Sequence, residues 1–418
     1  MLVGVVQGVS SSLSGSEIDE LRKQLQDLRQ ENAELKQRLS SQSNSIDGLI
    51  HRLEVLERRP SSVAPAPERT ASADHAAMAP AAGGAAAAKP ALNLRWYGDV
   101  NFRAGGKQRT GNDLPHTFSL GQLDLMAHSQ LAERFSVMSE VVFQYRENEA
   151  AATTIERLQF QYHASDMLNL RFGRMHTPFG YWNESFHHGT WFQTTALRPD
   201  LLRFHDGGSV LPIHSVGLEA YGYRSLPAVD VHYTVGVANG RPLLFSDTVD
   251  AQDVNNHKAV YGVLSFSPAA ISGLRLGVNG YVDAIAPDPS NRLRTARLDE
   301  LITGAHAVFL RDHIEFLAEA MRIQHEHEVT GKTFTTWGTY VQASYQAGAL
   351  KPYLRFDRLE VANDDPYYGA GVLDTTRYTA GMRWDFINWA ALKFEYQYVR
   401  QPGIDRRHGV HTQATFTF

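Results

Sequence analysis

The sequence predicts an all-β transmembrane β-barrel of sixteen antiparallel strands, preceded by an N-terminal α-helical coiled coil. Three patterns predict it: apolar and polar residues alternate from residue 92 onward, short and long connections follow each other in turn, and a heptad repeat precedes them. A helical membrane protein is excluded, because the mean hydropathy is −0.32 and no apolar run is long enough to span a bilayer. The same values do not exclude a transmembrane β-barrel, because alternating apolar and polar residues average to a hydrophilic score.

Composition narrows the function further. The 418 residues carry a net charge of −5, so no strongly basic surface indicates a nucleic-acid partner. Cysteine is absent, which excludes a disulfide framework and thiol chemistry and fits an exported protein. No cofactor is expected.

Three segments precede the barrel, which spans residues 92–418. Residues 1–15 resemble the remnant of a signal peptide, with a short apolar piece but no basic region before it. Residues 16–58 read as a coiled coil with its seam at Ile18, Leu21, Leu25 and onward; Asn32 at one seam position favours two strands without excluding a trimer. A single solvated helix is the alternative. Residues 59–91 form a Pro/Ala-rich flexible linker.

The barrel strands follow from alternation at period two. In the last segment Val410, Phe416 and Phe418 fall on one face, while His411 and Gln413 fall on the other. The sixteen predicted strands are 92–104, 117–131, 136–146, 154–163, 167–174, 214–224, 228–238, 257–267, 273–284, 300–310, 313–325, 333–347, 350–361, 376–386, 389–400 and 409–418.

The connections separate a membrane barrel from a soluble sandwich. Those after even-numbered strands are short, those after odd-numbered strands are mostly long, and the longest covers residues 175–213. Short turns on one rim, long loops on the other and an even strand count are typical of outer-membrane barrels. Both ends of the barrel then lie on the periplasmic rim, so the coiled coil is expected in the periplasm. A soluble sandwich or lipocalin-like barrel is the alternative, which tryptophans at strand ends such as Trp337 and Trp389 disfavour.

Several of these features resemble known porins. An amphipathic last strand ending in Phe418 is similar to the signal that the barrel assembly machinery of Gram-negative outer membranes recognises. Sixteen strands with the longest loop after the fifth resemble trimeric porins. The stretch "LRFGRMHTPFGYWNES", residues 170–185, resembles a segment of the phosphate-selective porin O/P superfamily, and the coiled coil is similar to its DcaP-like branch. The resemblance implies a homotrimer in the cell outer membrane that passes small, often anionic solutes.

Charges of both signs are predicted to line the pore. Strand parity places these residues on the inner wall: Arg157, Arg171, Arg275, Arg355, Glu140 and Asp357. Phosphate-specific members of the superfamily instead have a ladder of Arg and Lys. Mixed charges favour passive diffusion of small hydrophilic solutes through a water-filled channel, with a channel for small anions such as phosphate or dicarboxylates as the alternative. A further alternative is a tether between the outer membrane and the cell wall.

The long loop 175–213 is the predicted constriction, because a loop of this length in a compact domain is usually functional. A surface loop that only covers the pore or contacts a neighbour is the alternative. The predicted constriction residues are Arg174, His176, Glu184, His187, His188, Arg198, Arg203, His205 and Asp206.

The histidines raise the question of a metal site. No cysteine or regular carboxylate spacing completes one, and the side chains of the neighbours His187 and His188 diverge on an extended backbone, so no metal is predicted. A pH-dependent loop charge is the preferred hypothesis. The stretch "QHEHE", residues 324–328, is predicted to be a solvated loop tip. Enzyme activity is not expected, because no Gly-x-Ser-x-Gly elbow occurs on a strand-to-helix turn.

Overall fold

The computed structural model of the chain describes residues 92–105, 116–144, 152–187, 189–203, 210–245 and 254–418. The predicted segments 1–15, 16–58 and 59–91 lie outside the described residues, as do the predicted site residues His188, His205 and Asp206. Within the described part of the chain, no helix is long and apolar enough to cross a membrane.

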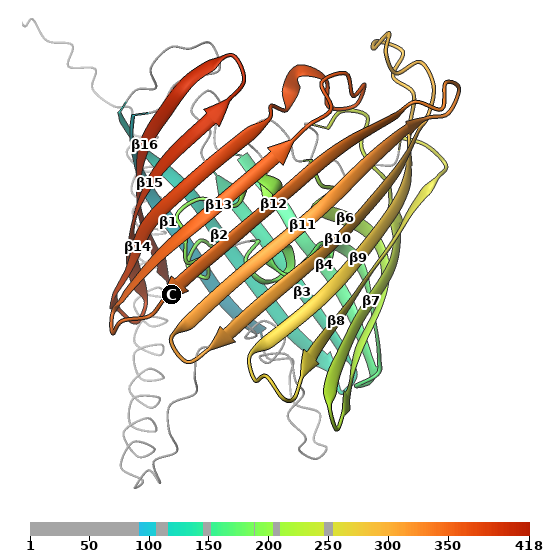
Figure 1. The fold of residues 1–418 in the computed structure, drawn as a ribbon. Coiled ribbons are helices and arrows are strands. Elements are labelled where there is room, and N and C mark those ends of the chain that lie inside the picture. Colours follow the sequence, from blue (N-terminus) through green and yellow to red (C-terminus); the bar gives the residue numbers. More distant parts are fainter. Residues whose placement is uncertain (1–91, 106–115, 145–151, 188, 204–209, 246–253) are drawn as a thin grey trace, which may run out of the picture. The chain divides into compact units, whose positions relative to one another are not determined.

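Sixteen antiparallel strands form one closed barrel, in which each strand pairs with its sequence neighbours and β1 pairs with β16 (Figure 1). The first eight are β1 (Leu92–Gly105), β2 (Thr117–Ala132), β3 (Phe135–Gln144), β4 (Ala152–Ser165), β5 (Leu168–His176), β6 (His214–Leu226), β7 (Val229–Asn239) and β8 (Lys258–Pro268). The others are β9 (Leu274–Ile285), β10 (Leu298–Arg311), β11 (Ile314–His327), β12 (Thr333–Tyr345), β13 (Leu350–Glu360), β14 (Thr375–Ile387), β15 (Ala390–Gln401) and β16 (Ile404–Thr417).

The predicted barrel is therefore confirmed, strand by strand. The ends differ from the predicted bounds by no more than two residues, except that β16 begins at Ile404 rather than at 409. The reason is local: residues 402–403 alone turn the chain from β15 into β16, and Gly403 adopts a φ of 69° there. At the C-terminal end of β16, the pairing with β1 continues to the last residue, where Trp96 and Phe418 exchange backbone hydrogen bonds of 3.0 and 3.1 Å.

The two faces of the wall differ in polarity. Outward-facing residues of β9 such as Leu276, Val278 and Val282 are exposed, whereas Asn279 and Asp283 on the inner face are buried. Trp337, Trp384 and Trp389 are exposed on the outside as well. An apolar outer face with aromatic residues near the strand ends is the pattern that lipid requires of a barrel.

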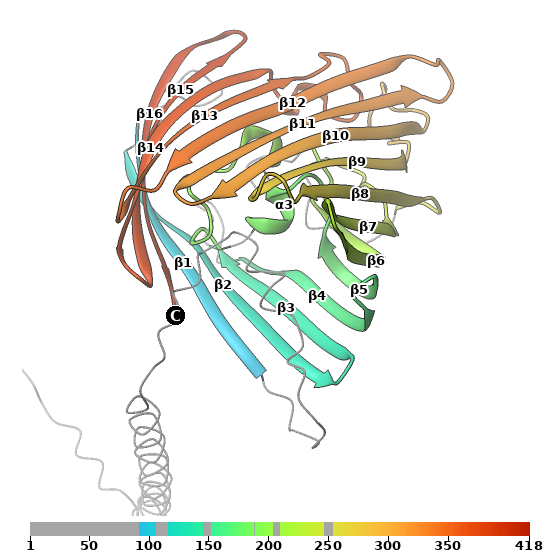
Figure 2. The same cartoon turned by 60° about the horizontal axis from the view of Figure 1, so that its bottom comes forward.

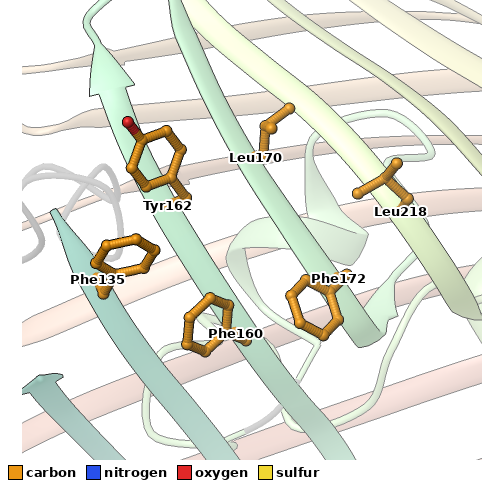
Figure 3. A pocket seen from close by; sticks show the side chains of 6 residues that line it. All are labelled: Phe135, Phe160, Tyr162, Leu170, Phe172 and Leu218. Atoms are coloured by element: carbon orange, nitrogen blue, oxygen red, sulfur yellow. The ribbon is translucent and has the colours of Figure 1, made fainter.

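Aromatic side chains also form a shallow groove on the outer face of β3 to β6 (Figure 3). Phe160 and Phe172 are neighbours in its lining, with ring centroids 5.1 Å apart. Phe135, Tyr162, Leu170 and Leu218 complete the lining. The groove belongs to the outer apolar surface and not to the interior of the barrel.

The hydrophobic core lies inside the barrel, between the wall and the segment that joins β5 to β6. This segment carries the one-turn helix α3 (Trp182–Ser185), seen within the ring of strands in Figure 2, and the 3-10 helix η1 (Asp200–Leu202). Its side chains Trp182 and Leu202 are buried against wall residues such as Tyr340 and Met321. A second 3-10 helix, η2 (Gly369–Gly371), lies between β13 and β14.

Candidate pore constriction

Backbone and amide hydrogen bonds close the root of the long loop. Thr177 N donates to Ile213 O at 2.9 Å, so the loop leaves and returns at one point. The Asn183 side chain reinforces this closure, because its Nδ2 donates to Thr177 O at 2.8 Å and to Ile213 O at 3.0 Å. The loop therefore starts from a fixed base above β5 and β6.

A buried carboxylate on the opposite wall holds the helical turn of the loop. Glu319 of β11 accepts hydrogen bonds from Tyr181 N at 3.0 Å, Trp182 N at 2.7 Å and the Tyr340 hydroxyl at 2.9 Å. The turn before the helix requires glycine, since Gly180 has a φ of 62° and a Cβ there would lie 1.9 Å from Glu319 Oε2. This contact crosses the interior from the loop after β5 to β11.

The second half of the loop is anchored to β13 and β14. Arg377 binds the Asp200 carboxylate through two hydrogen bonds of 2.9 Å, and Asp200 N donates to Asp357 at 3.0 Å. Arg355 donates to Thr195 Oγ1 at 2.9 Å and to Leu197 O at 2.7 Å. Burial alone would raise the pKa of Asp200, but Arg377, with Arg203 and Arg355, lowers that pKa to about 2.

Further contacts attach the middle of the loop to β14 and β15. Arg383 donates to Trp191 O at 2.6 Å and to Gln193 O at 2.9 Å. Lys393 donates to Thr195 O at 3.1 Å, and Ala196 N donates to Glu395 at 2.9 Å. The loop thus lies inside the barrel and is hydrogen-bonded to strands far from its own root.

The predicted wall residues line the inner face, mostly as ion pairs. Arg157 contacts Glu140 at 2.6 Å, and Arg355 contacts Asp357 at 2.9 Å. Arg171 pairs with Glu219 and, at 3.4 Å, with Glu184 of α3. Arg275 differs, because its guanidinium lies 5.7 Å from the centre of the Tyr181 ring and forms no ion pair with a described residue.

The described constriction residues fall into four places rather than one ring. Glu184 contacts Arg171 of β5 at 3.4 Å, and Arg203 lies 3.3 Å from Asp200, which also binds Arg377. Arg198 lies near the ring of Trp182 and donates to His187 O at 2.9 Å. Arg174, His176 and His187 are buried at the root of the loop.

A histidine cluster occupies that root. His176 and His214 are opposite each other in the β5–β6 ladder, and the ring centroid of His187 lies 4.0 Å from that of His176 and 4.6 Å from that of His214. Glu156 Oε2 lies 2.7 Å from His214 Nε2. The sequence analysis addressed only the adjacent pair His187 and His188. It could not predict the cluster, because His176 and His214 come together with His187 only when the long loop returns to its root.

Glu156 and Arg377 are two interior residues that the sequence analysis did not identify. A β-bulge in β4 explains the first: Arg157 pairs with Glu140 and Ile155 with Val141, so Glu156 is an extra residue and both it and Arg157 are buried. Strict alternation would have placed Glu156 outside. Arg377 shares the parity of Arg383 within β14, so the alternation could have found it.

The prediction of a solvated tip at residues 324–328 was wrong for His325. This side chain is fully buried, with Nδ1 2.8 Å from Asp365 and Nε2 3.1 Å from Glu300. The loop between β13 and β14 supplies Asp365 and covers the end of β11, which the sequence could not show.

No protein-family model matches the sequence, and no curated protein matches it either. Among solved structures, the anion-selective porin from Comamonas acidovorans matches with a TM-score of 0.55 at 10% identity, over 79% of this chain and 100% of that one. The barrel has the fold of outer-membrane porins. The outer membrane channel DcaP of Acinetobacter baumannii matches with a TM-score of 0.52 at 13% identity, over 81% of this chain and 100% of that one. OmpT of Vibrio cholerae in its trimer form matches with a TM-score of 0.53 at 11% identity, over 79% and 100%.

Proposed function

We propose that the protein is a porin of the outer membrane, through which small hydrophilic solutes diffuse passively, and that loop 175–213 narrows its water-filled lumen. The observation that carries this proposal is a long loop bonded to the inner side of the opposite wall, within a closed barrel whose outer face is apolar. The closed ladder pairs the backbone of every strand on both sides, as a membrane requires.

Mixed charges would set the selectivity of this pore. The interior holds arginines beside carboxylates, as in the pairs Arg157–Glu140 and Arg355–Asp357, so neither sign dominates the wall. Side chains of opposite sign on wall and loop create a field across the lumen, which orients solutes without binding them tightly.

A channel for small anions, such as phosphate or dicarboxylates, is the second candidate. Arg275 favours it, because this cation stands beside the loop residue Tyr181 with no acid of the described residues at ion-pair distance. One structural neighbour is itself named an anion-selective porin.

We further propose that the protein is a homotrimer, with the coiled coil 16–58 in the periplasm and the strand ending in Phe418 recognised by the barrel assembly machinery. The trimer form of the OmpT neighbour supports the first point. The exposed ring of Phe418, which stacks on Trp96 with centroids 6.2 Å apart, supports the last.

Swelling of liposomes in neutral sugars of graded size tests the function. We expect swelling that falls as the sugar grows. A variant in which a short Gly/Ser linker replaces residues 178–212 should admit larger sugars than the full chain. If the folded full chain admits no sugar while the shortened variant does, the loop closes the pore. That result would contradict passive diffusion.

A further inference from the structure

Three histidines meet at the root of the long loop. His176 ends β5, His214 begins β6, and His187 follows α3. One ligand nitrogen from each lies within 4.8 Å of the other two, and both His176 and His187 are buried. We propose that this cluster binds a divalent first-row transition-metal ion of the Zn²⁺ class, which joins both strand ends to the loop.

One of the three imidazoles is held by a hydrogen bond as metal ligands usually are, and a second lies against a carboxylate. A ligating histidine normally donates its second ring N–H to a carboxylate or carbonyl oxygen, which fixes the ring and raises its basicity. His187 Nδ1 lies 2.6 Å from Asn183 Oδ1, and His214 Nε2 lies 2.7 Å from Glu156 Oε2.

The role of Asn183 determines which nitrogen of His187 would bind the ion. Because Asn183 Nδ2 donates to Thr177 O and Ile213 O, its Oδ1 is the acceptor that faces His187. His187 Nδ1 then carries the proton, and Nε2 keeps the lone pair. A nitrogen that is preset in this way needs no change of tautomer when an ion arrives.

The geometry and charge suit a borderline metal ion. Three nitrogens about 2.0–2.1 Å from a tetrahedral ion lie about 3.3 Å apart, so small side-chain rotations would close the present spacing. Imidazoles prefer Zn²⁺, Ni²⁺ or Cu²⁺ over Mg²⁺ or Ca²⁺. Glu156, aimed inward by the bulge in β4, and Glu140, 3.9 Å from His176 Nε2, place two carboxylates beside the cluster.

Binding would lock the root of the loop. The loop leaves the wall at Thr177 and returns at Ile213, and an ion held by His176, His187 and His214 would fix both ends and the first turn between them. This inference goes beyond the proposed pore, because binding requires only the folded barrel and is measured without any transport.

Cobalt titration of the full chain in detergent tests the proposal. After treatment with a chelator, Co²⁺ should bind at one ion per chain with the visible absorption of tetrahedral cobalt, and Zn²⁺ should displace it. His187→Gln should abolish this absorption. Glu156→Gln, which keeps all three histidines, should weaken affinity by about 10- to 100-fold. The control His313→Gln alters an exposed histidine in the turn between β10 and β11 and should change nothing.

Two results would overturn the site. One is a folded wild-type barrel, shown by its gel mobility before heating, that binds no stoichiometric ion. The other is binding that His187→Gln leaves intact. Should His187→Gln not fold, Glu156→Gln decides, and an unchanged affinity in that variant contradicts the proposal.

Discussion

Asp200 shows how one buried acid can hold a long loop in place. Its carboxylate accepts two hydrogen bonds from Arg377, and its backbone nitrogen binds Asp357. Because the pKa of Asp200 is lowered to about 2, the acid stays ionised throughout the range in which the protein would work. A lowered pKa stabilises the docked loop above the ordinary pKa of about 3.9, and this contribution is lost only as the pH falls through about 2.

Asp200→Asn should therefore loosen the loop at neutral pH. We expect docking of the segment around η1 to weaken by on the order of 2 kcal/mol, because the charged partner of Arg377 is lost. Hydrogen exchange should show lower protection factors in residues 197–203, and the loss should be equal at pH 5 and pH 8. Glu360→Gln, which removes an exposed ion pair with Arg358, is the control. Equal protection in both variants would contradict the anchoring role.

Gly180 and Gly348 form a matched pair for testing the contact with Glu319. Both have a φ of 62°, but a Cβ at Gly180 would meet the carboxylate of Glu319, whereas nothing lies within 4 Å of one at Gly348. Gly180→Ala and Gly348→Ala carry the same backbone strain, so only the first should also raise hydrogen exchange at Tyr181 and Trp182. Similar exchange at these amides in both variants would show that Glu319 does not hold the turn.

Arg275 is the residue through which charge selectivity is tested. Arg275→Glu reverses the sign of a side chain beside the loop and should shift the ratio of anion to cation permeability towards cations, measured as a reversal potential across a KCl gradient. Arg311→Glu, at an exposed end of β10, is the control and should leave the ratio unchanged. An unaltered potential in Arg275→Glu would remove the main support for the anion channel.

At the scale of the strand, alternation predicts most of the barrel and fails where the backbone departs from it. The wall residues Glu140, Arg157 and Asp357 lie inside as their parity predicts. Glu156 does not follow the rule, because a bulge inserts it. Arg171 and His176 of β5 are an odd number of residues apart, so strict alternation would place their side chains on opposite faces. Both side chains nevertheless contact acids of the interior. Gly173, which lies between them, has a φ of 125°. The alternation of apolar and polar residues in the sequence does not reveal such bulges and irregularities of the backbone.

A charge on the outer face of β9 tests whether that face meets lipid. Val278 is exposed in the middle of this strand, so Val278→Arg should lower the free energy of unfolding in lipid vesicles by up to about 2–4 kcal/mol. Denaturant titration measures the free energy of unfolding, and Val278→Leu is the control. Equal stability of the two variants would argue that water, and not lipid, covers the outer face.

For the whole molecule, the fold was predictable and the path of the long loop was not. Sixteen alternating segments with short and long connections admit little besides a closed barrel, and the strand order follows from the chain order. The loop was identified from its length and its charges, but its partners Glu319, Arg377 and Lys393 lie on strands more than a hundred residues away. The histidine cluster likewise depends on the loop returning to its root.

Single-channel recording in a planar bilayer tests the central claim, a water-filled pore, most directly. The proposal predicts stable conductance steps in groups of three, which become larger when residues 178–212 are replaced by a short linker. A folded and inserted protein that gives no steps with the loop intact would contradict it.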